Sequence, residues 1–243
     1  MVDVAAARAE LAPTGVLRAG INMSNFLLVT GKTESGDPVG VSPSMAGEVA
    51  RRLGVALQMV PYPNPGVLAD AAGTGAWDIG LIGADPLRSE KTAFTAAYCE
   101  IEATYMVPPG SKLATIEDVD KPGVRICVSA RSAYDLWLER NIKHATLVRT
   151  DGLKGAFEMY LQGGVDALAG LRPGLTGDHA KAPRHVIMAG KFMAVQQAIG
   201  CGKALLAGGA FLRAFVEEAK ASGLVAGFIA QHKVVGLSVA PPA

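Results

Sequence analysis

Short apolar runs rich in β-branched residues alternate along the chain with segments in which apolar residues recur at helical spacing. This alternation is typical of α/β folds, in which helices cover the faces of a central sheet. The runs predicted to be strands are residues 16–21, 56–60, 77–84, 104–107, 124–129, 145–148, 165–169 and 185–188. The hydrophobic pattern therefore predicts the α/β class.

The segments between these runs carry signals for helix ends. A first helix is expected from Ser42, interpreted as its N-cap, through Pro43 at the first helical position to Gly54. A second opens with Ser132 and Asp135, which resemble a capping box with Asp in place of the usual Glu. Each of these helices follows a predicted strand, as βαβ units require.

Two further helices are predicted from apolar spacing. One begins near Asp151 and ends at residues 163–164, and its side chains expected toward a core are Leu153, Phe157, Tyr160 and Leu161. The last fifth of the chain is expected to be helical, with a buried face of Phe211, Leu212, Phe215, Val216 and Ala219.

Composition excludes several classes of function. The chain has 243 residues, of which 19% are charged, and a formal net charge of +1. This balance provides no basic surface for nucleic acid. The longest apolar runs, such as residues 204–210, are far shorter than the roughly 20 residues that span a bilayer. Neither a nucleic acid nor membrane insertion is expected.

Cysteine, histidine and motif patterns predict no metal and no cofactor. The three cysteines, Cys99, Cys127 and Cys201, are widely spaced and are interpreted as buried thiols. The four histidines have no metal-ligand spacing. The sequence contains no GxSxG, Walker or GxGxxG motif.

The stretch GADPLRSEKTAF, residues 83–94, directly follows an apolar strand at residues 77–82 and carries Arg88. Ligands of open α/β sheets bind at the carboxyl ends of the strands. A guanidinium keeps its charge and matches a carboxylate or phosphate with two parallel donors. Arg88 is therefore a candidate anion ligand; the alternative is a surface salt bridge to Asp85 or Glu90.

The order of these segments resembles the amino-acid-type (family 3) periplasmic solute-binding proteins of bacterial ABC transporters, over about residues 13–237. TGVLRAGIN is similar to the family's first strand, and GDPVGVSPSMAGEVARRLG to the segment that leads into its first helix. GAWDIGLIGADPLRSEKTAFTAAY is the most specific match, in which the positions that agree are Asp78, Arg88, Phe94, Thr95 and Tyr98.

The resemblance implies a type II fold of two α/β lobes that are joined by crossing strands and close over a small solute. Lobe 1 would comprise residues 1–102 and 195–243, and lobe 2 residues 103–194. The resemblance also implies a monomer that delivers its solute to an ABC permease. No signal-peptide pattern is visible in residues 1–11. We expect a periplasmic location if a signal was trimmed, and a cytoplasmic one if Met1 is the native start.

The resemblance implies that Arg88 binds the α-carboxylate of the ligand, with Ser132 and Ala133 as a second clamp from the other lobe. The N–H groups at a helix start attract anions, which supports the second clamp, although Ser132 can also be a plain N-cap. Gly83 is small enough to let a ligand approach the backbone. Tyr134, in the first helical turn, is the aromatic residue best placed to contact the ligand.

The chain departs from the family at the positions that bind an ammonium group. The expected lobe 2 carboxylate is replaced by Leu171, and Asn22 and Asn25 stand where some members have an aspartate and an aromatic residue. An ammonium without its partner would lose about 2 to 5 kcal/mol in a closed site. We therefore expect a small carboxylate with hydroxyl, keto or amide groups, unless Asp85 or Glu102 binds an ammonium.

Two alternatives remain. Cyclohexadienyl dehydratase uses the same fold as an enzyme, and the candidate general acids or bases here are Glu48, Glu100 and Glu102. Their other interpretation is as exposed hinge charges, and no catalytic residue is assigned. A cytoplasmic ligand sensor would share the fold, but no DNA-binding helix pair precedes residue 13.

Overall fold

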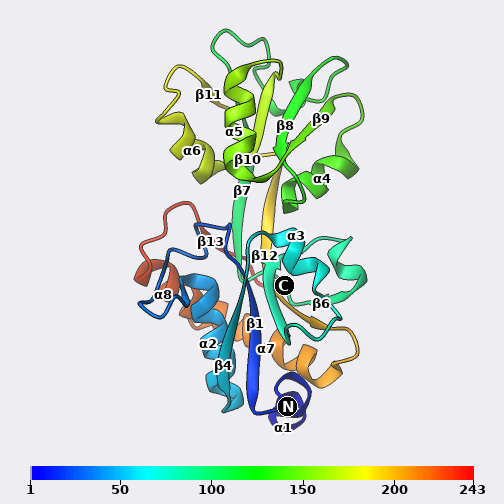
Figure 1. The fold of residues 1–243 in the computed structure, drawn as a ribbon, viewed down its shortest axis with the longest axis vertical. Coiled ribbons are helices and arrows are strands. Elements are labelled where there is room, and N and C mark those ends of the chain that lie inside the picture. The colour runs from blue at the N-terminus through cyan, green and yellow to red at the C-terminus, as the bar shows by residue number, and fades with distance from the viewer. Residues whose placement is uncertain (1) are drawn as a thin grey trace. The chain divides into compact units, whose positions relative to one another are not determined.

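The chain divides into two α/β units in a computed structural model that describes residues 2–243 (Figure 1). Unit 1 comprises the chain up to Glu100 together with Gln196–Ala243, and unit 2 comprises Ile101–Val195. The chain passes from one unit to the other within β7 (Cys99–Val107) and returns within β12 (Met193–Gly202). The predicted fold class, a two-lobed α/β protein, is confirmed.

The sheet of unit 1 has the order β4 (Ala56–Tyr62), β1 (Val16–Asn22), β5 (Ile79–Gly83), β12. β1 is parallel to β4 and β5, whereas β12 is antiparallel to β5. The carboxyl ends of β4, β1 and β5 therefore share one edge. Shorter strands complete the unit: β6 (Thr92–Phe94) on β12, β13 (Ser238–Val239) on β7, and a separate hairpin of β2 (Gly31–Lys32) and β3 (Pro38–Val39).

The helices of unit 1 are α1 (Val4–Leu11), α2 (Val41–Leu53), α3 (Pro65–Asp70), α7 (Leu206–Ala221) and α8 (Leu224–Gln231). The predicted apolar face of α7 is buried and confirmed: Phe211, Leu212, Phe215, Val216 and Ala219. Leu68 of α3 and Trp77, which lies shortly before β5, pack closely on the sheet. A Cβ at Gly20 of β1 would lie 3.2 Å from the Trp77 ring. The glycine in β1 thus allows the indole to lie against the strand.

The start of α2 differs from the prediction. Gly40, not Ser42, is the N-cap, and its φ of 151° suits glycine. A Cβ at Gly40 would lie 2.2 Å from the Leu28 carbonyl oxygen, so a side chain cannot fit. Ser42 is buried, and its hydroxyl lies 2.8 Å from the Tyr98 hydroxyl. The local N-cap preference of serine is overridden by this tertiary hydrogen bond.

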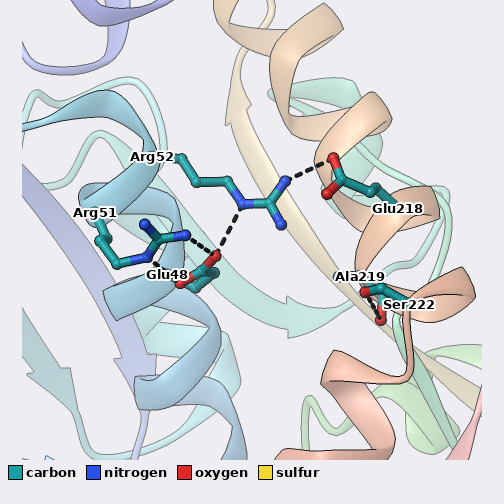
Figure 2. Close-up of polar contacts among 6 residues, drawn as sticks. All are labelled: Glu48, Arg51, Arg52, Glu218, Ala219 and Ser222. Carbon is teal, nitrogen blue, oxygen red and sulfur yellow. Dashed lines mark hydrogen bonds and ion pairs between the residues drawn. The ribbon is translucent and has the colours of Figure 1, made fainter.

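Arg52 joins α2 to α7, as Figure 2 shows. Its Nε donates to Glu48 Oε1 at 2.9 Å on α2, and its Nη1 donates to Glu218 Oε2 at 2.7 Å on α7. The guanidinium also lies 5.0 Å from the centre of the Phe215 ring, within cation–π range. Arg51 contributes a second pair to Glu48, 2.7 Å from Nε to Oε2. One carboxylate thus accepts hydrogen bonds from two arginines.

Unit 2 has a sheet in the order β7, β10 (Ala167–Leu171), β8 (Arg125–Ser129), β9 (Thr146–Thr150). β10, β8 and β9 run parallel, and β7 is antiparallel to β10 and to β11 (Val186–Ile187). The carboxyl ends of the three parallel strands again share one edge. The helices that follow them are α4 (Ala133–Asn141), α5 (Gly152–Gln162) and α6 (Arg172–His179).

The buried face of α5 is narrower than predicted. Phe157 and Tyr160 lie in the core of unit 2, as expected. Leu153 and Leu161 are 40% and 47% exposed, so their predicted burial is wrong. Both lie within one residue of the helix ends, and the stretch that reaches the core is the middle of the helix.

The interpretation of the cysteines as buried free thiols is confirmed for Cys99, Cys127 and Cys201. Burial raises the pKa of all three, that of Cys201 to about 11, so they remain protonated near neutral pH. Within residues 2–243, no helix combines the length and apolar character that crossing a membrane requires.

Candidate ligand-binding edges

Arg88 lies just beyond the carboxyl end of β5, in a short 3-10 helix (Arg88–Glu90). It is only 6% exposed, and its Nη1 donates to the Gly83 carbonyl oxygen at 2.7 Å. This burial shows that the guanidinium is not a solvated surface charge. The role as an anion ligand and the alternative of a salt bridge to Asp85 or Glu90 both stay predictions. The backbone hydrogen bond fixes the position of the guanidinium at the edge of the sheet.

Asp85 shapes the loop that carries Arg88. Its Oδ1 accepts from the Leu87 N–H at 2.9 Å, and its carbonyl oxygen accepts from the Ser89 N–H and hydroxyl, each at 2.9 Å. The side chain is 5% exposed. These bonds assign Asp85 a structural role in the turn, and its predicted contact with a ligand stays a prediction.

The strand register tells on which side of β5 the Arg88 guanidinium lies. The Ala84 N–H donates to the Gln196 carbonyl at 2.7 Å, so Gly83 and Gln197, the next pair, do not bond each other. The Gly83 carbonyl therefore points away from β12 and toward the side on which β1 pairs with β5. Arg88, bound to this carbonyl, lies on the side where β1 ends at Asn22.

Asn22, the last residue of β1, and Asn25, in the loop after it, carry side-chain amides. Asn22 Oδ1 accepts from the hydroxyl of Ser24 at 2.9 Å and from its N–H at 3.2 Å. Asn25 Oδ1 accepts from the Leu27 N–H at 3.2 Å. Backbone N–H groups donate to both side-chain oxygens, so the orientation of each amide is fixed. These bonds do not use the NH₂ groups, which can donate to other acceptors. Such donors match ligand oxygens and do not match an ammonium group.

In unit 2, Ser132 is the N-cap of α4, as predicted. Its Oγ accepts from the Asp135 N–H at 3.1 Å. The predicted second half of the capping box is replaced, because Asp135 accepts from the Arg131 N–H at 2.7 Å and from Arg149 Nε at 2.9 Å. Arg131 has a φ of 61°, and the bond from its N–H to Asp135 supports this left-handed conformation. The turn between β8 and α4 is thereby fixed.

Ala133 and Tyr134 occupy the first turn of α4, where helix N–H groups have no intrahelical acceptor. The partial positive charge of these groups suits an anion. The Tyr134 ring is 3% exposed and belongs to the core of unit 2, with Tyr105 and Val128. Burial raises the Tyr134 pKa to about 12, although hydrogen bonds to Ser132 and Ser129 act in the opposite direction. A ligand contact of Tyr134 stays a prediction.

Leu171 ends β10 and is the N-cap of α6, with no side-chain cap bond. A leucine at this carboxyl end offers no side-chain acceptor to an ammonium. Asp166, four residues after the end of α5, accepts from the Arg125 N–H at 2.8 Å and so connects two strand starts. It does not take the place of the missing carboxylate.

The structure adds polar residues at these edges that sequence reasoning missed. Ser129 and Thr150 form a register pair at the carboxyl ends of β8 and β9. Thr150 Oγ1 and Gln197 Oε1 are buried and have no hydrogen-bond partner within residues 2–243. For Ser129 and Thr150, the only signal in the sequence was a polar residue at the end of a predicted strand. The sequence pattern contains no signal that Gln197 lies at one of these edges.

Comparison with known families decides the membership of the chain. The model of the bacterial extracellular solute-binding proteins, family 3, matches residues 17–228. The chain belongs to this family. No match was found among curated proteins.

Solved structures resemble the family 3 chain over nearly its whole length. A mutant of ArgBP from T. maritima is 25% identical, with a TM-score of 0.74 and coverage of 93% of this chain and 99% of that one. A putative binding component of an ABC transporter from Wolinella succinogenes, complexed with lysine, is 20% identical, with a TM-score of 0.74 and coverage of 90% and 95%. The ancestral amino acid-binding protein AncCDT-1, a precursor of cyclohexadienyl dehydratase, is 21% identical, with a TM-score of 0.72 and coverage of 91% and 97%.

Two of the three carboxylates considered for an enzyme in this solute-binding protein, Glu48 and Glu102, form ion pairs with arginine or lysine side chains. Hydrogen bonds from Arg51 and Arg52 lower the pKa of Glu48 to about 2. Glu102 forms ion pairs with Arg172 at 2.9 Å and Lys191 at 3.3 Å, and the bond from Arg172 lowers its pKa. Glu100 accepts from Gln196 Nε2 at 2.8 Å. A general acid needs a raised pKa, so Glu48 and Glu102 are unsuited to that role.

Proposed function

We propose that this family 3 protein binds a small carboxylate solute, with Arg88 as the main ligand of the carboxylate, and delivers it to an ABC permease. The observation that carries the proposal is the burial of the Arg88 guanidinium at the carboxyl edge of unit 1, fixed by the Gly83 carbonyl. A fixed, buried guanidinium binds a carboxylate through charge-assisted hydrogen bonds. The family consists of extracellular solute-binding proteins, which supports capture outside the cytoplasm, in the periplasm.

The other predicted residues have roles that follow from their chemistry. Asn22 and Asn25 would donate to further oxygens of the ligand, beside Gly83, which lets the ligand approach the backbone. Ser132 and Ala133, in unit 2, would bind a carboxylate through the start of α4. Tyr134 would contact the ligand through its hydroxyl. The chain would act as a monomer without a cofactor.

We propose a deaminated acid in preference to an α-amino acid. Similar structures include an arginine-bound form of ArgBP and the complex with lysine, so amino acids are the reference ligands. In the present chain Leu171 offers no carboxylate, and Asn22 and Asn25 offer donors where an ammonium needs acceptors. Asp85 and Glu102 are the acids considered for an ammonium. The Asp85 carboxylate already accepts from the Leu87 N–H, and Glu102 is paired with Arg172 and Lys191.

The proposal is tested by calorimetric titration of the native protein and of Arg88→Met with matched acids. Suitable pairs are lactate and alanine, 2-hydroxyisovalerate and valine, and 3-phenyllactate and phenylalanine. We expect the native protein to bind a deaminated acid and Arg88→Met to lose about 2 to 5 kcal/mol, roughly 30- to several-thousand-fold in affinity.

Arg51→Ala is the matched control. It removes the same charge from unit 1, but the Arg51 side chain lies in the last turn of α2 and is 71% exposed. Its affinity for the acids should equal that of the native protein. Binding that is unchanged in Arg88→Met would refute the carboxylate role of Arg88, and binding of α-amino acids alone would refute the preference for deaminated acids.

A further inference from the structure

Gln197 lies in the part of β12 that belongs to unit 1, in register with Gly83 of β5. Its side chain is 3% exposed. Its backbone carbonyl accepts from the Tyr98 N–H at 2.8 Å, on the side of β12 away from β5. The backbone carbonyl of Gln197 is therefore satisfied by a backbone hydrogen bond, and it is the side chain that needs an explanation.

The side-chain oxygen of Gln197 is a buried acceptor that has no hydrogen-bond partner among residues 2–243. Buried polar side chains without a partner are rare in native proteins, and each costs about 1 to 3 kcal/mol. A methionine or leucine would fill a similar volume without this cost. The amide at this position therefore indicates a use that packing does not account for.

The strand register brings Gln197 next to the residue that positions Arg88. Gly83 and Gln197 form a non-hydrogen-bonded antiparallel pair, in which the Cα atoms are only about 4.5 Å apart and the side chains share one face. Gly83 has no side chain, so the Gln197 side chain has no cross-strand neighbour from β5 at this register position. Gly83 also accepts the hydrogen bond from Arg88. A cation and an unpaired acceptor thus both adjoin Gly83.

We propose that Gln197 determines specificity by accepting a hydrogen bond from a hydroxyl group of the ligand, and that the ligand class is 2-hydroxy acids. This inference rests on the proposed function, in which Arg88 binds the carboxylate. A hydroxyl both donates and accepts, so it can donate to Gln197 Oε1 while it accepts from the amide of Asn22 or Asn25. An ammonium could also donate to Gln197 Oε1, but it cannot accept from the amide of Asn22 or Asn25. A plain acid leaves Gln197 Oε1 unpaired.

The test compares 2-hydroxy acids with the same acids without the hydroxyl, in the native protein and in Gln197→Met. The probe pairs are lactate and propionate, 2-hydroxyisovalerate and isovalerate, and 3-phenyllactate and 3-phenylpropionate, measured by titration calorimetry. We expect the native protein to prefer the hydroxy acid by about 10- to 100-fold, since the buried acceptor otherwise stays unpaired. In Gln197→Met this ratio should fall to about 1 while the plain acid still binds.

Gln196→Met is the matched control. Gln196 is the neighbour of Gln197 in the chain, but its side chain donates to Glu100 at 2.8 Å, so this variant should keep the native ratio of affinities. Gln197→Leu is a second apolar variant in case Gln197→Met fails to fold. An unchanged ratio in a folded Gln197 variant, together with a raised melting temperature, would overturn the inference and leave the role of Arg88 intact. If Arg88→Met lost all binding while Gln197→Met kept the native ratio of affinities for hydroxy and plain acids, the role of Gln197 would likewise be overturned and that of Arg88 kept.

Discussion

The Arg88 guanidinium donates to the Gly83 carbonyl oxygen at 2.7 Å, so a residue of the loop after β5 is held by the last residue of that strand. Gly83 is in turn paired with β12. The cation is thereby attached to a strand inside the sheet of unit 1. This arrangement lowers the entropic cost of binding an anion, because the guanidinium is already in place.

Arg88→Lys should weaken binding of carboxylates while the charge remains. A lysine ammonium is a point charge and cannot donate to Gly83 and to both oxygens of a carboxylate in the fork geometry of arginine. We expect the affinity to fall by about tenfold or more, an effect smaller than that of Arg88→Met. Titration calorimetry with the tightest acid measures it, and an affinity equal to the native value would show that only the charge is used.

The sequence predicted the elements on which this site depends, because buried strands and the loops after them have strong local signals. The apolar run before Arg88 became β5, and the polar residues Ser132 and Asp135 marked the start of α4. Parallel strands place their carboxyl ends at one edge, so the candidate residues could be assigned to edges from chain order alone.

The residues that sequence reasoning misjudged depend on contacts between distant segments. Ser42 has the local features of an N-cap but bonds Tyr98, 56 positions away in the chain. The pairing of Gln197 with Gly83 exists only through the register of β12, which the pattern of apolar residues did not delimit. The short helix α6 was missed because Pro173, Gly174 and Gly177 weaken its helical pattern.

Asn22→Asp should shift the preference of the site toward α-amino acids. The new carboxylate can keep the bonds from Ser24 while its second oxygen becomes an acceptor for an ammonium. We expect the ratio of affinities for valine and 2-hydroxyisovalerate to rise at least about tenfold, since the pair is charge-assisted. Asn64→Asp, at the N-cap of α3, adds the same charge elsewhere in unit 1 and should leave the ratio unchanged. An unchanged ratio in Asn22→Asp would show that this residue does not face the ligand.

Gly40→Ala should destabilise unit 1. The Cβ would lie 2.2 Å from the Leu28 carbonyl oxygen, and the φ of 151° is unfavourable for any side chain. We expect a loss of at least about 1 to 3 kcal/mol in the free energy of unfolding, measured by urea denaturation. Gly47→Ala, within the same helix and with nothing within 4 Å of the new Cβ, should instead stabilise by about 0.5 to 1 kcal/mol. Equal effects of the two substitutions would contradict the close approach at Gly40.

Glu48 should make stability depend on pH in the acidic range. Hydrogen bonds from Arg51 and Arg52 lower its pKa from 4.5 to about 2 in the folded chain. A lowered folded pKa means that the unfolded chain binds the proton more tightly, so the contribution is complete above pH 4.5 and is lost as the pH falls toward 2.

Urea denaturation between pH 2.5 and 7 measures this contribution. Glu48→Gln should lower stability at pH 7, since Arg52 loses an acceptor on α2, and the difference from the native protein should shrink as the pH falls below 4.5. Glu34→Gln, an exposed position between β2 and β3, is the control and should follow the native curve. If the difference between Glu48→Gln and the native protein stayed constant from pH 7 to 2.5, the ion pairs of Glu48 would not be the source of its contribution.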